Sequence, residues 1–347
     1  MIRMFDMRQI FLLIWMIVFC PIVLAVESEK DSQYHNVVEE TIANTGFNGT
    51  VLISKDGRVI FHENIGFSDD DRKTLISNKH LFCPGSVGKE FTTISIMQLV
   101  EQGKLSYEDS ISEYIPGFPS WAKNITVEHI LTHTSGLPKV KWEKYIDTSD
   151  VIKQMKNSTL AFEPGNDYLY TNLNVVVRAL IVERITGDTY SNFAKEFIFD
   201  VAGMTDSYFQ VDANNLSKLK VTGDYPTAVN GVTLYVTPLD LLKFETALRG
   251  SLLLPIEKIK NTLQGDELSG KRNRAYFDFG KFYNDKHGSI VYWEHDGSNP
   301  SHHTIKHSDF KNDYTIILMS SDGNKSTLYK IRDALKIQLG KNNSVET

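Results

Sequence analysis

Ser86-Val87-Gly88-Lys89 stands directly before a long apolar run, from Phe91 to Val100, that stops at Gly103. This layout predicts a serine in the first turn of a buried helix, with a lysine one turn further on. Residues three apart on a helix lie on one face, so the serine hydroxyl and the lysine amine can meet. A serine becomes a nucleophile when a base takes its proton, and a lysine kept neutral by burial can be that base. Alone, this spacing has low specificity, because a surface helix can contain it by chance.

The bulk composition is that of an ordinary soluble globular protein. The chain has 347 residues, of which 41% are hydrophobic and 23% are charged, and its formal net charge is -6. This length suits one large domain or two interleaved ones. Because no block of basic residues stands out, we expect no nucleic-acid partner.

The N-terminus has the pattern of a secretory signal peptide. Two arginines precede an apolar stretch over 10–23, and the small residue Ala25 closes the pattern. We place cleavage after Ala25, so that 1–25 is the signal peptide and 26–347 the mature domain of a secreted or periplasmic protein. We expect no stable membrane span after cleavage, because the apolar stretch is shorter than the roughly 20 residues of a spanning helix. An uncleaved segment that anchors the chain is the alternative.

Cleavage leaves Cys83 as the one cysteine of the mature chain, so an internal disulfide cannot form. Its place three residues before Ser86 invites interpretation as a nucleophile. A small buried hydrophobic side chain near the start of the helix is the interpretation that we favour.

Strand patterns lie at both ends of the chain, and helical patterns lie in the middle. The predicted strands cover 50–54, 59–66, 275–282, 289–294, 303–307 and 314–320. The predicted helices include 32–44, 172–185, one that begins at Thr237-Pro238-Leu239-Asp240, and 326–339. Separate runs of this kind predict an α+β fold. We expect an antiparallel sheet of about five strands, built from about 45–70 and 274–340 and flanked by helices, with a mostly helical lobe inserted over about 86–265.

A second candidate motif is Tyr170-Thr171-Asn172, which follows the turn-forming Pro164-Gly165-Asn166 and precedes a helix. A tyrosine near two cationic groups can lose its proton below its usual pKa and relay protons at the nucleophile. The asparagine amide can hold a substrate carbonyl. Tyr170 and its neighbour Tyr168 also suit plain core aromatics, so this motif is weak by itself.

A third candidate is His295-Asp296-Gly297, at the end of a predicted strand. A glycine there permits a ligand to approach the backbone closely. The N–H of the next residue, Ser298, can point at a developing oxyanion beside the N–H of Ser86. A helix N-terminus at Ser86 favours the same negative charge.

In this order, the three motifs resemble those of the serine β-lactamase and penicillin-binding protein superfamily, in the branch of class C β-lactamases, DD-peptidases and related esterases. They match its Ser-x-x-Lys, its Tyr-x-Asn and the His-x-Gly form of its third motif. The similarity runs from about Asn44 to Ser320. Further stretches share it, among them Phe47-Asn48-Gly49-Thr50-Val51, Leu131-Thr132-His133-Thr134-Ser135-Gly136-Leu137 and Thr237-Pro238-Leu239-Asp240-Leu241.

The resemblance implies a β-lactamase/transpeptidase-like fold and a role for each motif residue. Ser86 is then the acylated nucleophile, Lys89 and Tyr170 are its proton-transfer partners, and Asn172 and His295 contact the substrate. Whether the lysine or the tyrosine takes the serine proton stays open.

The sequence departs from the family pattern in two places. β-Lactamases of this branch usually carry a lysine at position 295, and a histidine is more typical of DD-peptidases, aminopeptidases and esterases. The family also tends to follow the motif with Gly-x-Pro-Gly, where this chain has Ser298-Asn299-Pro300-Ser301. The missing glycines raise the question of how efficiently the site turns over.

Clusters of histidines suggest a metal site but do not have the spacing of one. His302, His303 and His307 lack a cysteine or acidic ligand at a recognisable distance. His129 and His133 are four residues apart, but Ile130 stands where a metalloprotease needs glutamate. We therefore expect no metal and no cofactor, and we expect His133 to hold the loop beneath the active site.

Taken together, the sequence predicts a serine hydrolase that forms an acyl-enzyme on an amide or an ester. Carboxypeptidase-like or esterase-like activity fits better than efficient β-lactamase activity. The expected partner is a small-molecule or peptide substrate, with peptidoglycan stem peptides, D-amino-acid amides, small esters and β-lactams all open. The alternative is a relative that binds penicillin or peptidoglycan, or is acylated by it, without turnover.

Overall fold

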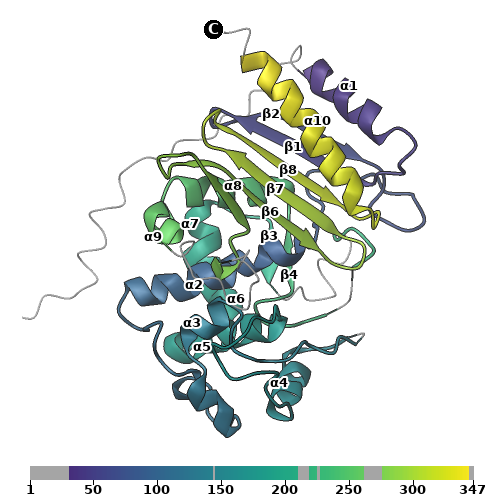
Figure 1. Ribbon diagram of the computed structural model, residues 1–347. Helices are drawn as coiled ribbons and strands as arrows, with labels where there is room; N and C mark the ends of the chain where they lie inside the picture. Colours follow the sequence, from purple (N-terminus) through teal and green to yellow (C-terminus); the bar gives the residue numbers. More distant parts are fainter. Residues whose placement is uncertain (1–30, 144, 210–218, 225–226, 262–275, 344–347) are drawn as a thin grey trace, which may run out of the picture.

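The two ends of the described chain meet in one antiparallel sheet, which crosses the upper half of Figure 1. The computed structural model describes residues 31–143, 145–209, 219–224, 227–261 and 276–343, so the predicted signal peptide lies outside the described residues. The six strands lie in the order β2-β1-β8-β7-β6-β5. They are β1 (Gly49–Lys55), β2 (Arg58–Ile65), β5 (Lys281–Asn284), β6 (Ile290–Ser298), β7 (His303–Asp309) and β8 (Tyr314–Ser320).

The N-terminal hairpin joins the C-terminal strands through β1 and β8. Gly49 lies opposite Ser320, and Lys55 lies opposite Tyr314, so the two strands pair along their whole length. The turn Asp56-Gly57 connects β1 to β2 as the sequence predicts. The α+β prediction with a sheet from both chain ends is therefore confirmed, with six strands rather than about five.

Helices cover both faces of the sheet. α1 (Asp31–Ile42) and α10 (Lys325–Asn343) lie side by side on one face (Figure 1). Val51 and Leu318 point to this side, where they pack with Leu335 of α10. Leu52 and Ile317 point to the other side and join the core of the helical lobe. Because β1 and β8 are buried on both faces, their sequences are nearly continuous apolar runs.

The lobe on the other face is mostly helical, as expected. Its helices are α2 (Lys89–Glu101), α3 (Val127–Leu131), α4 (Thr148–Lys156), α5 (Asn172–Thr186), α6 (Tyr190–Ala194), α7 (Asp200–Ala202), α8 (Pro238–Arg249) and α9 (Ile256–Asn261). A short hairpin of β3 (Ser207–Phe209) and β4 (Leu234–Val236) also lies in the lobe. None of the helices in the described ranges is long and apolar enough to cross a membrane.

Helix boundaries follow the predicted caps. α5 ends at Gly187, whose φ of 74° suits a left-handed C-cap. α8 begins after Thr237, whose side chain accepts a hydrogen bond from the Asp240 N–H, with Pro238 in the first turn. α2 is different, because it is buried on nearly every side and therefore shows no single apolar stripe.

The strand predicted over 275–282 is wrong for residues 276–280, the first of its residues that the structure describes. Tyr276–Asp278 forms a 3-10 turn in which Phe277 has a φ of 52°, and β5 begins only at Lys281. Phe277 and Phe279 satisfy the alternating apolar pattern by packing into the core from this turn. The Asp278 carboxylate meets charged partners in the helical lobe, which a regular strand would not permit.

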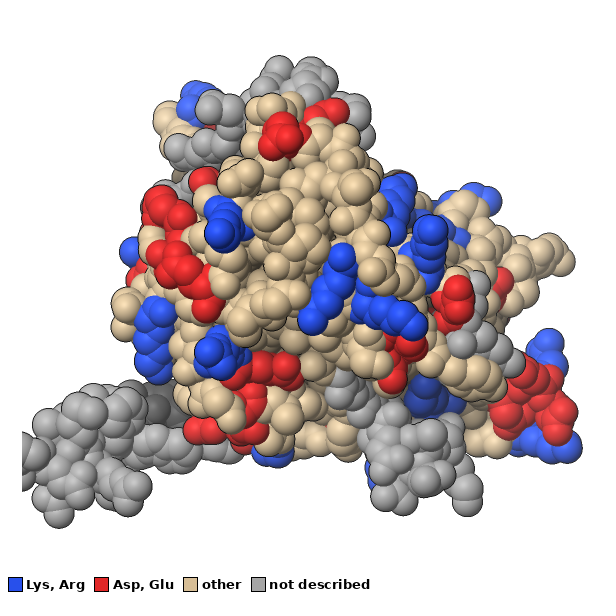
Figure 2. Space-filling view, turned by 90° about the horizontal axis from the view of Figure 1, so that it is seen from below, with Lys and Arg blue, Asp and Glu red and all other residues tan. Residues whose placement is uncertain are grey.

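The charged surface is mixed. On the face that Figure 2 shows, acidic and basic side chains gather in small groups that alternate with uncharged surface.

Candidate active site

Ser86 lies at the junction of the sheet and the helical lobe, in the 3-10 turn η2 (Gly85–Gly88) that leads into α2. The serine therefore stands one turn before the helix rather than within its first turn. Lys89 is the first residue of α2, and its Nζ donates a hydrogen bond to Ser86 Oγ at 3.4 Å. The spacing that the sequence singled out thus brings the serine hydroxyl and the lysine amine together through local geometry alone.

Burial makes the Lys89 amine a weaker base than a surface lysine. Its side chain is 7% exposed, and desolvation lowers its pKa to about 8. The Asp278 carboxylate acts in the opposite direction, and the Arg178 guanidinium acts in the same direction as burial. The amine therefore gives up its proton at a lower pH than an ordinary lysine does, as a candidate general base requires.

Tyr170 packs over Lys89, with the lysine Nζ 5.0 Å from the centroid of its ring. The same ring lies 4.5 Å from the ring of His133. The sequence suggested a lowered tyrosine pKa, and that is wrong. Burial raises the pKa of Tyr170, the Asp278 charge raises it further, and a hydrogen bond with Ser86 lowers it too little to compensate. Tyr170 is therefore a protonated phenol near neutral pH, so its hydroxyl can donate.

The end of β6 presses against the serine turn. A Cβ atom added at Gly297 would lie 1.9 Å from the Pro84 oxygen and 2.9 Å from the Ser86 nitrogen. A Cβ atom added at Gly85, whose φ is 59°, would lie 2.4 Å from the Ser298 nitrogen. The two glycines let the backbones meet, and this contact places the serine turn, with the Ser86 N–H, against the strand end that carries the Ser298 N–H. That is the arrangement an oxyanion site needs.

Asn172 is the first residue of α5, after the N-cap Thr171. Its Oδ1 is buried and has no hydrogen-bond partner among the described residues. Asn172 and Ser298 both line a pocket of about 240 Å³, so the second and third motifs reach one cavity. The Oδ1 atom is itself closed to solvent, so the place of Asn172 in the lining does not make this acceptor available to a ligand.

His295 lies on the side of β6 that faces α2, and it is 7% exposed. Its Nδ1 lies 2.5 Å from Glu90 Oε1. The other oxygen of Glu90 accepts a hydrogen bond from Lys306 at 2.6 Å, and Lys306 also bonds to Glu245 at 2.6 Å. One edge of the imidazole is therefore occupied by the protein, and only Nε2 remains for the predicted substrate contact.

A buried polar cluster beneath the site was missed by the sequence analysis, apart from His133. His133 Nε2 lies 3.0 Å from Asp278 Oδ1, and its Nδ1 lies 2.8 Å from the Asn174 amide. Arg178 bonds to Asp278 at 2.7 Å and donates to the Ile130 carbonyl. The available signal was Arg178, an arginine in the middle of the apolar run 175–182. His133 holds the loop as expected, since the Thr171 and Leu169 backbone N–H groups bond to it.

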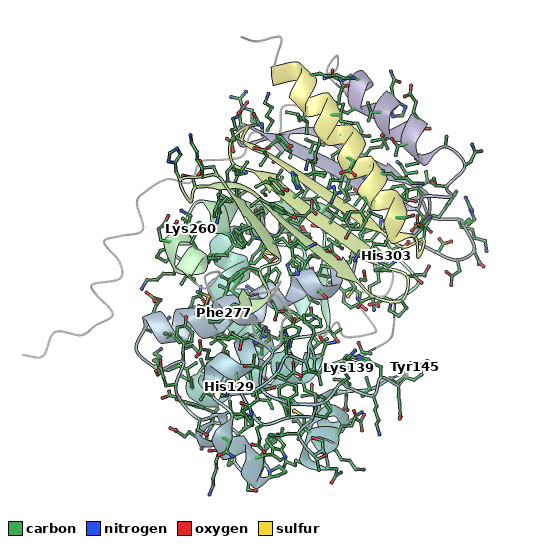
Figure 3. The ribbon with its side chains drawn as sticks, in the orientation of Figure 1. His129, Lys139, Tyr145, Lys260, Phe277 and His303 are labelled. Carbon is green, nitrogen blue, oxygen red and sulfur yellow. The ribbon has the colours of Figure 1, made fainter. Side chains whose placement is uncertain are left out.

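Most of the remaining candidates have structural partners, although the buried Nδ1 of His303 has none among the described residues. Cys83 is buried, and this burial raises the pKa of its thiol well above the usual value. The charge of the nearby Asp224 raises it further, by a smaller amount. His302 accepts from the Cys83 N–H at 3.1 Å, and His307 bonds to Glu294 at 2.9 Å. His129 takes part in the capping box of α3. Figure 3 shows that His129 and His303 lie in different parts of the molecule, one in the lobe and one in the sheet.

In this fold, Ser86 precedes a buried helix and meets Lys89 at the start of that helix. Tyr170 from the lobe and the end of β6 at Gly297 lie against the same serine. This chain belongs to the Beta-lactamase family, whose model matches residues 35–340. Over 171 residues it is 35% identical to penicillin-binding protein 4* of Bacillus subtilis. That match covers 46% of this chain and 38% of the relative, so the chain spans about four-tenths of the length of this curated relative.

Solved structures show the same fold. The crystal structure of a penicillin-binding protein from Bacillus halodurans matches with a TM-score of 0.73 at 23% identity, over 88% of this chain and 98% of that one. D-amino acid amidase from Ochrobactrum anthropi matches with a TM-score of 0.70 at 18% identity, over 88% of this chain and 99% of that one.

Proposed function

We propose that this protein is a serine hydrolase that transfers an acyl group through Ser86. The observation that carries the proposal is the 3.4 Å hydrogen bond from Lys89 Nζ to Ser86 Oγ, with the amine buried and its pKa lowered to about 8. Membership of the Beta-lactamase family supports a serine hydrolase of the acyl-transfer type. We also propose that the chain is exported after cleavage behind Ala25, which N-terminal sequencing of the mature protein tests.

The proposed reaction has two stages. Ser86 Oγ attacks the carbonyl carbon of an amide or ester, and its proton passes to Lys89 directly or through Tyr170. The carbonyl oxygen becomes negative and accepts from the backbone N–H groups of Ser86 and Ser298. The intermediate then expels the leaving group, which takes up the proton, and leaves an ester on Ser86. Attack by water on this ester regenerates the serine and releases the acid.

The finer proposal is carboxypeptidase-like or esterase-like activity in place of efficient β-lactam hydrolysis. A β-lactamase of this branch usually presents a lysine where this chain has His295. Here the imidazole is largely buried, and Glu90 engages its Nδ1. The site therefore offers a substrate carboxylate one ring edge rather than a free ammonium group. D-amino acid amidase, which shares the fold, shows that the scaffold accommodates substrates other than β-lactams.

The second candidate is a protein that is acylated but does not turn over. The run Ser298-Asn299-Pro300-Ser301 favours it, because it has no glycine where the family usually places two. A stable acyl adduct with no product release would support this candidate. Turnover that depends on both Ser86 and Lys89 would support the hydrolase.

Covalent labelling tests the proposal. Intact-mass analysis after a fluorophosphonate or a penicillin should show one adduct, which is lost in Ser86→Ala. Ser95→Ala is the matched control, because Ser95 lies in α2, the helix that follows Ser86, and its hydroxyl donates to the Phe91 carbonyl. Absence of an adduct with every acyl donor, or an adduct that survives Ser86→Ala, would refute the proposal.

A further inference from the structure

Glu90 is a buried carboxylate that the proposed mechanism does not use, although it directly follows Lys89 in the chain. Its Oε1 lies 2.5 Å from Nδ1 of His295, and its Oε2 accepts a hydrogen bond from Lys306 at 2.6 Å. Each oxygen therefore has its own partner. Because an ionised carboxylate only accepts hydrogen bonds, the proton of the bond between Glu90 and His295 lies on Nδ1.

The other ring nitrogen of His295 lies on the side of the reaction centre. His295 stands two residues before Gly297 on β6, so the two residues share one face of the sheet. That face meets the serine turn, since a Cβ atom added at Gly297 would lie 2.9 Å from the Ser86 nitrogen. Within the described part of the chain, Nε2 makes no hydrogen bond and is not one of the enclosed atoms that lack a partner. It is therefore open to a ligand.

Charged side chains face the His295 ring from several of the elements packed against it. They are Glu90 of α2, Lys306 of β7, Glu245 of α8 behind that lysine, and Asp296 of β6. Asp296 points to the opposite face of the sheet, where it pairs with Lys325. On the lobe side, two carboxylates and one ammonium group leave one negative charge, which a protonated ring would balance.

From this geometry we propose that Glu90 is a positioning residue that fixes the tautomer of His295 and thereby makes recognition of a substrate carboxylate depend on pH. The inference rests on the proposed acyl transfer at Ser86. With its proton on Nδ1, the neutral ring turns the lone pair of Nε2 toward the substrate, where it repels a carboxylate. The protonated ring keeps its bond to Glu90 and offers an Nε2–H donor to the same carboxylate.

Glu90→Gln should invert the tautomer. Lys306 only donates, so the oxygen of the new amide must face Lys306 and the NH2 group must face His295. Nδ1 then accepts, and the neutral ring carries its proton on Nε2. NMR of the imidazole nitrogens in histidine-labelled protein measures the tautomer, and His295→Gln assigns the signals. Glu245→Gln is the matched control, because it removes the other carboxylate that binds Lys306 without touching His295.

The kinetic measurement is the ratio of kcat/KM for an ester that carries a carboxylate to kcat/KM for its carboxamide counterpart. The folded fraction and the titration of Lys89 cancel in this ratio, because they act equally on both esters. The pair 3-acetoxybenzoate and 3-acetoxybenzamide has the variable group on the leaving part. The pair p-nitrophenyl 4-carboxybenzoate and p-nitrophenyl 4-carbamoylbenzoate has it on the acyl part. Rates with Ser86→Ala give the background.

Between about pH 5 and about pH 8, where a histidine changes its charge, the wild-type ratio should fall by about tenfold or more for one pair. In Glu90→Gln the ratio should stay within about twofold over the same range, because the ring carries a proton on Nε2 at both ends. Glu245→Gln should keep the wild-type fall. The pair that shows the fall identifies which half of the substrate carries the carboxylate.

Several results would overturn the inference and leave acyl transfer intact. They are a wild-type tautomer in Glu90→Gln, a ratio that falls equally with pH in wild type and Glu90→Gln, and a flat wild-type ratio for both pairs. Inversion of the tautomer in Glu245→Gln would also overturn it, because the charge of the cluster rather than the bond to Glu90 would then be responsible. If no ester acylates Ser86, the proposed function fails, and the NMR measurement still decides whether Glu90 sets the tautomer.

Discussion

Arg178 and Asp278 form a 2.7 Å ion pair in which both side chains are fully buried, and both charges act on Lys89. Asp278 raises the pKa of the lysine, and Arg178 lowers it. The pair also anchors the loop that carries His133, since Asp278 bonds to the His133 ring. A single buried contact therefore acts both on the packing of the lobe and on the basicity of the Lys89 amine.

Replacement of Asp278 by asparagine should reveal both effects. The variant leaves the Arg178 charge buried without its partner, so we expect the free energy of unfolding in urea to fall by about 3–5 kcal/mol. Loss of the carboxylate also lowers the pKa of Lys89 further, so the pH profile of acylation should move to lower pH. Asp313→Asn is the matched control, because Asp313 pairs with Arg249 at the same 2.7 Å at an exposed site. It should lose less than about 1 kcal/mol, and equal losses in the two variants would contradict the argument.

The acylation rate of the wild-type protein should rise with pH and level off above about pH 8. Lys89 takes a proton from Ser86 only when its amine is neutral, and its pKa is lowered to about 8. Tyr170 does not titrate in this range, because burial raises its pKa. The burst of p-nitrophenol from an ester, followed from about pH 6 to about pH 10, measures this dependence. A flat profile, or one that still climbs at the upper end, would exclude Lys89 as the titrating base.

The lowered pKa of Lys89 also makes the free energy of unfolding depend on pH, and the direction of this dependence follows from the shift. Between about pH 8 and 10.5 the unfolded chain holds a proton on Lys89 that the folded protein has released. Folding therefore becomes more favourable as pH rises through this window. Lys89→Met should remove this contribution, and urea titrations at both ends of the window measure it. A wild-type stability gain no larger than that of the variant would show that another group is responsible.

Local motifs made the site partly predictable. Ser86 and Lys89 are three residues apart, so their contact needs only a turn and a helix. The sequence indicated a close approach at Gly297 but assigned it to a ligand, whereas the structure places the backbone of Pro84 and Ser86 there. The α+β arrangement followed from where the strand patterns lie along the chain, and the hairpin Asp56-Gly57 fixed the register of the first two strands.

The charge network behind the site was beyond a reading of the sequence. His295 and Glu90 are separated by 205 residues, and Lys306 and Glu90 by 216. Nothing local indicates that these side chains face one another. The pKa of Tyr170 was misjudged for a related reason, since the proximity of cations was visible in the motif but the depth of burial was not. Asp278 was hidden in an alternating pattern typical of a strand, and the structure resolves that pattern as a tight turn.

Gly297→Ala should impair acylation through geometry alone. The new Cβ would lie 1.9 Å from the Pro84 oxygen, so β6 and the serine turn must separate. The N–H groups of Ser86 and Ser298 then move apart, and we expect the acylation rate to fall by about a hundredfold or more. Gly340→Ala is the control, because a Cβ there meets nothing within 4 Å and the residue is helical. An acylation rate for Gly297→Ala within a few-fold of the control would refute the oxyanion assignment.

The ion pairs around Glu90 predict which of two variants, Lys306→Met or Glu90→Gln, loses more free energy of unfolding. Lys306 is fully buried between Glu90 and Glu245, and its pKa is raised by these carboxylates despite the opposing effect of burial. Lys306→Met leaves two buried carboxylates without their cation, so the free energy of unfolding should fall by about 3–5 kcal/mol. Glu90→Gln removes one charge but leaves the lysine paired with Glu245, so its cost should be smaller, about 1–3 kcal/mol. Urea unfolding of the two variants measures the order. If Glu90→Gln costs more than Lys306→Met, then the bond from Glu90 to His295, rather than the lysine, holds β6 against α2.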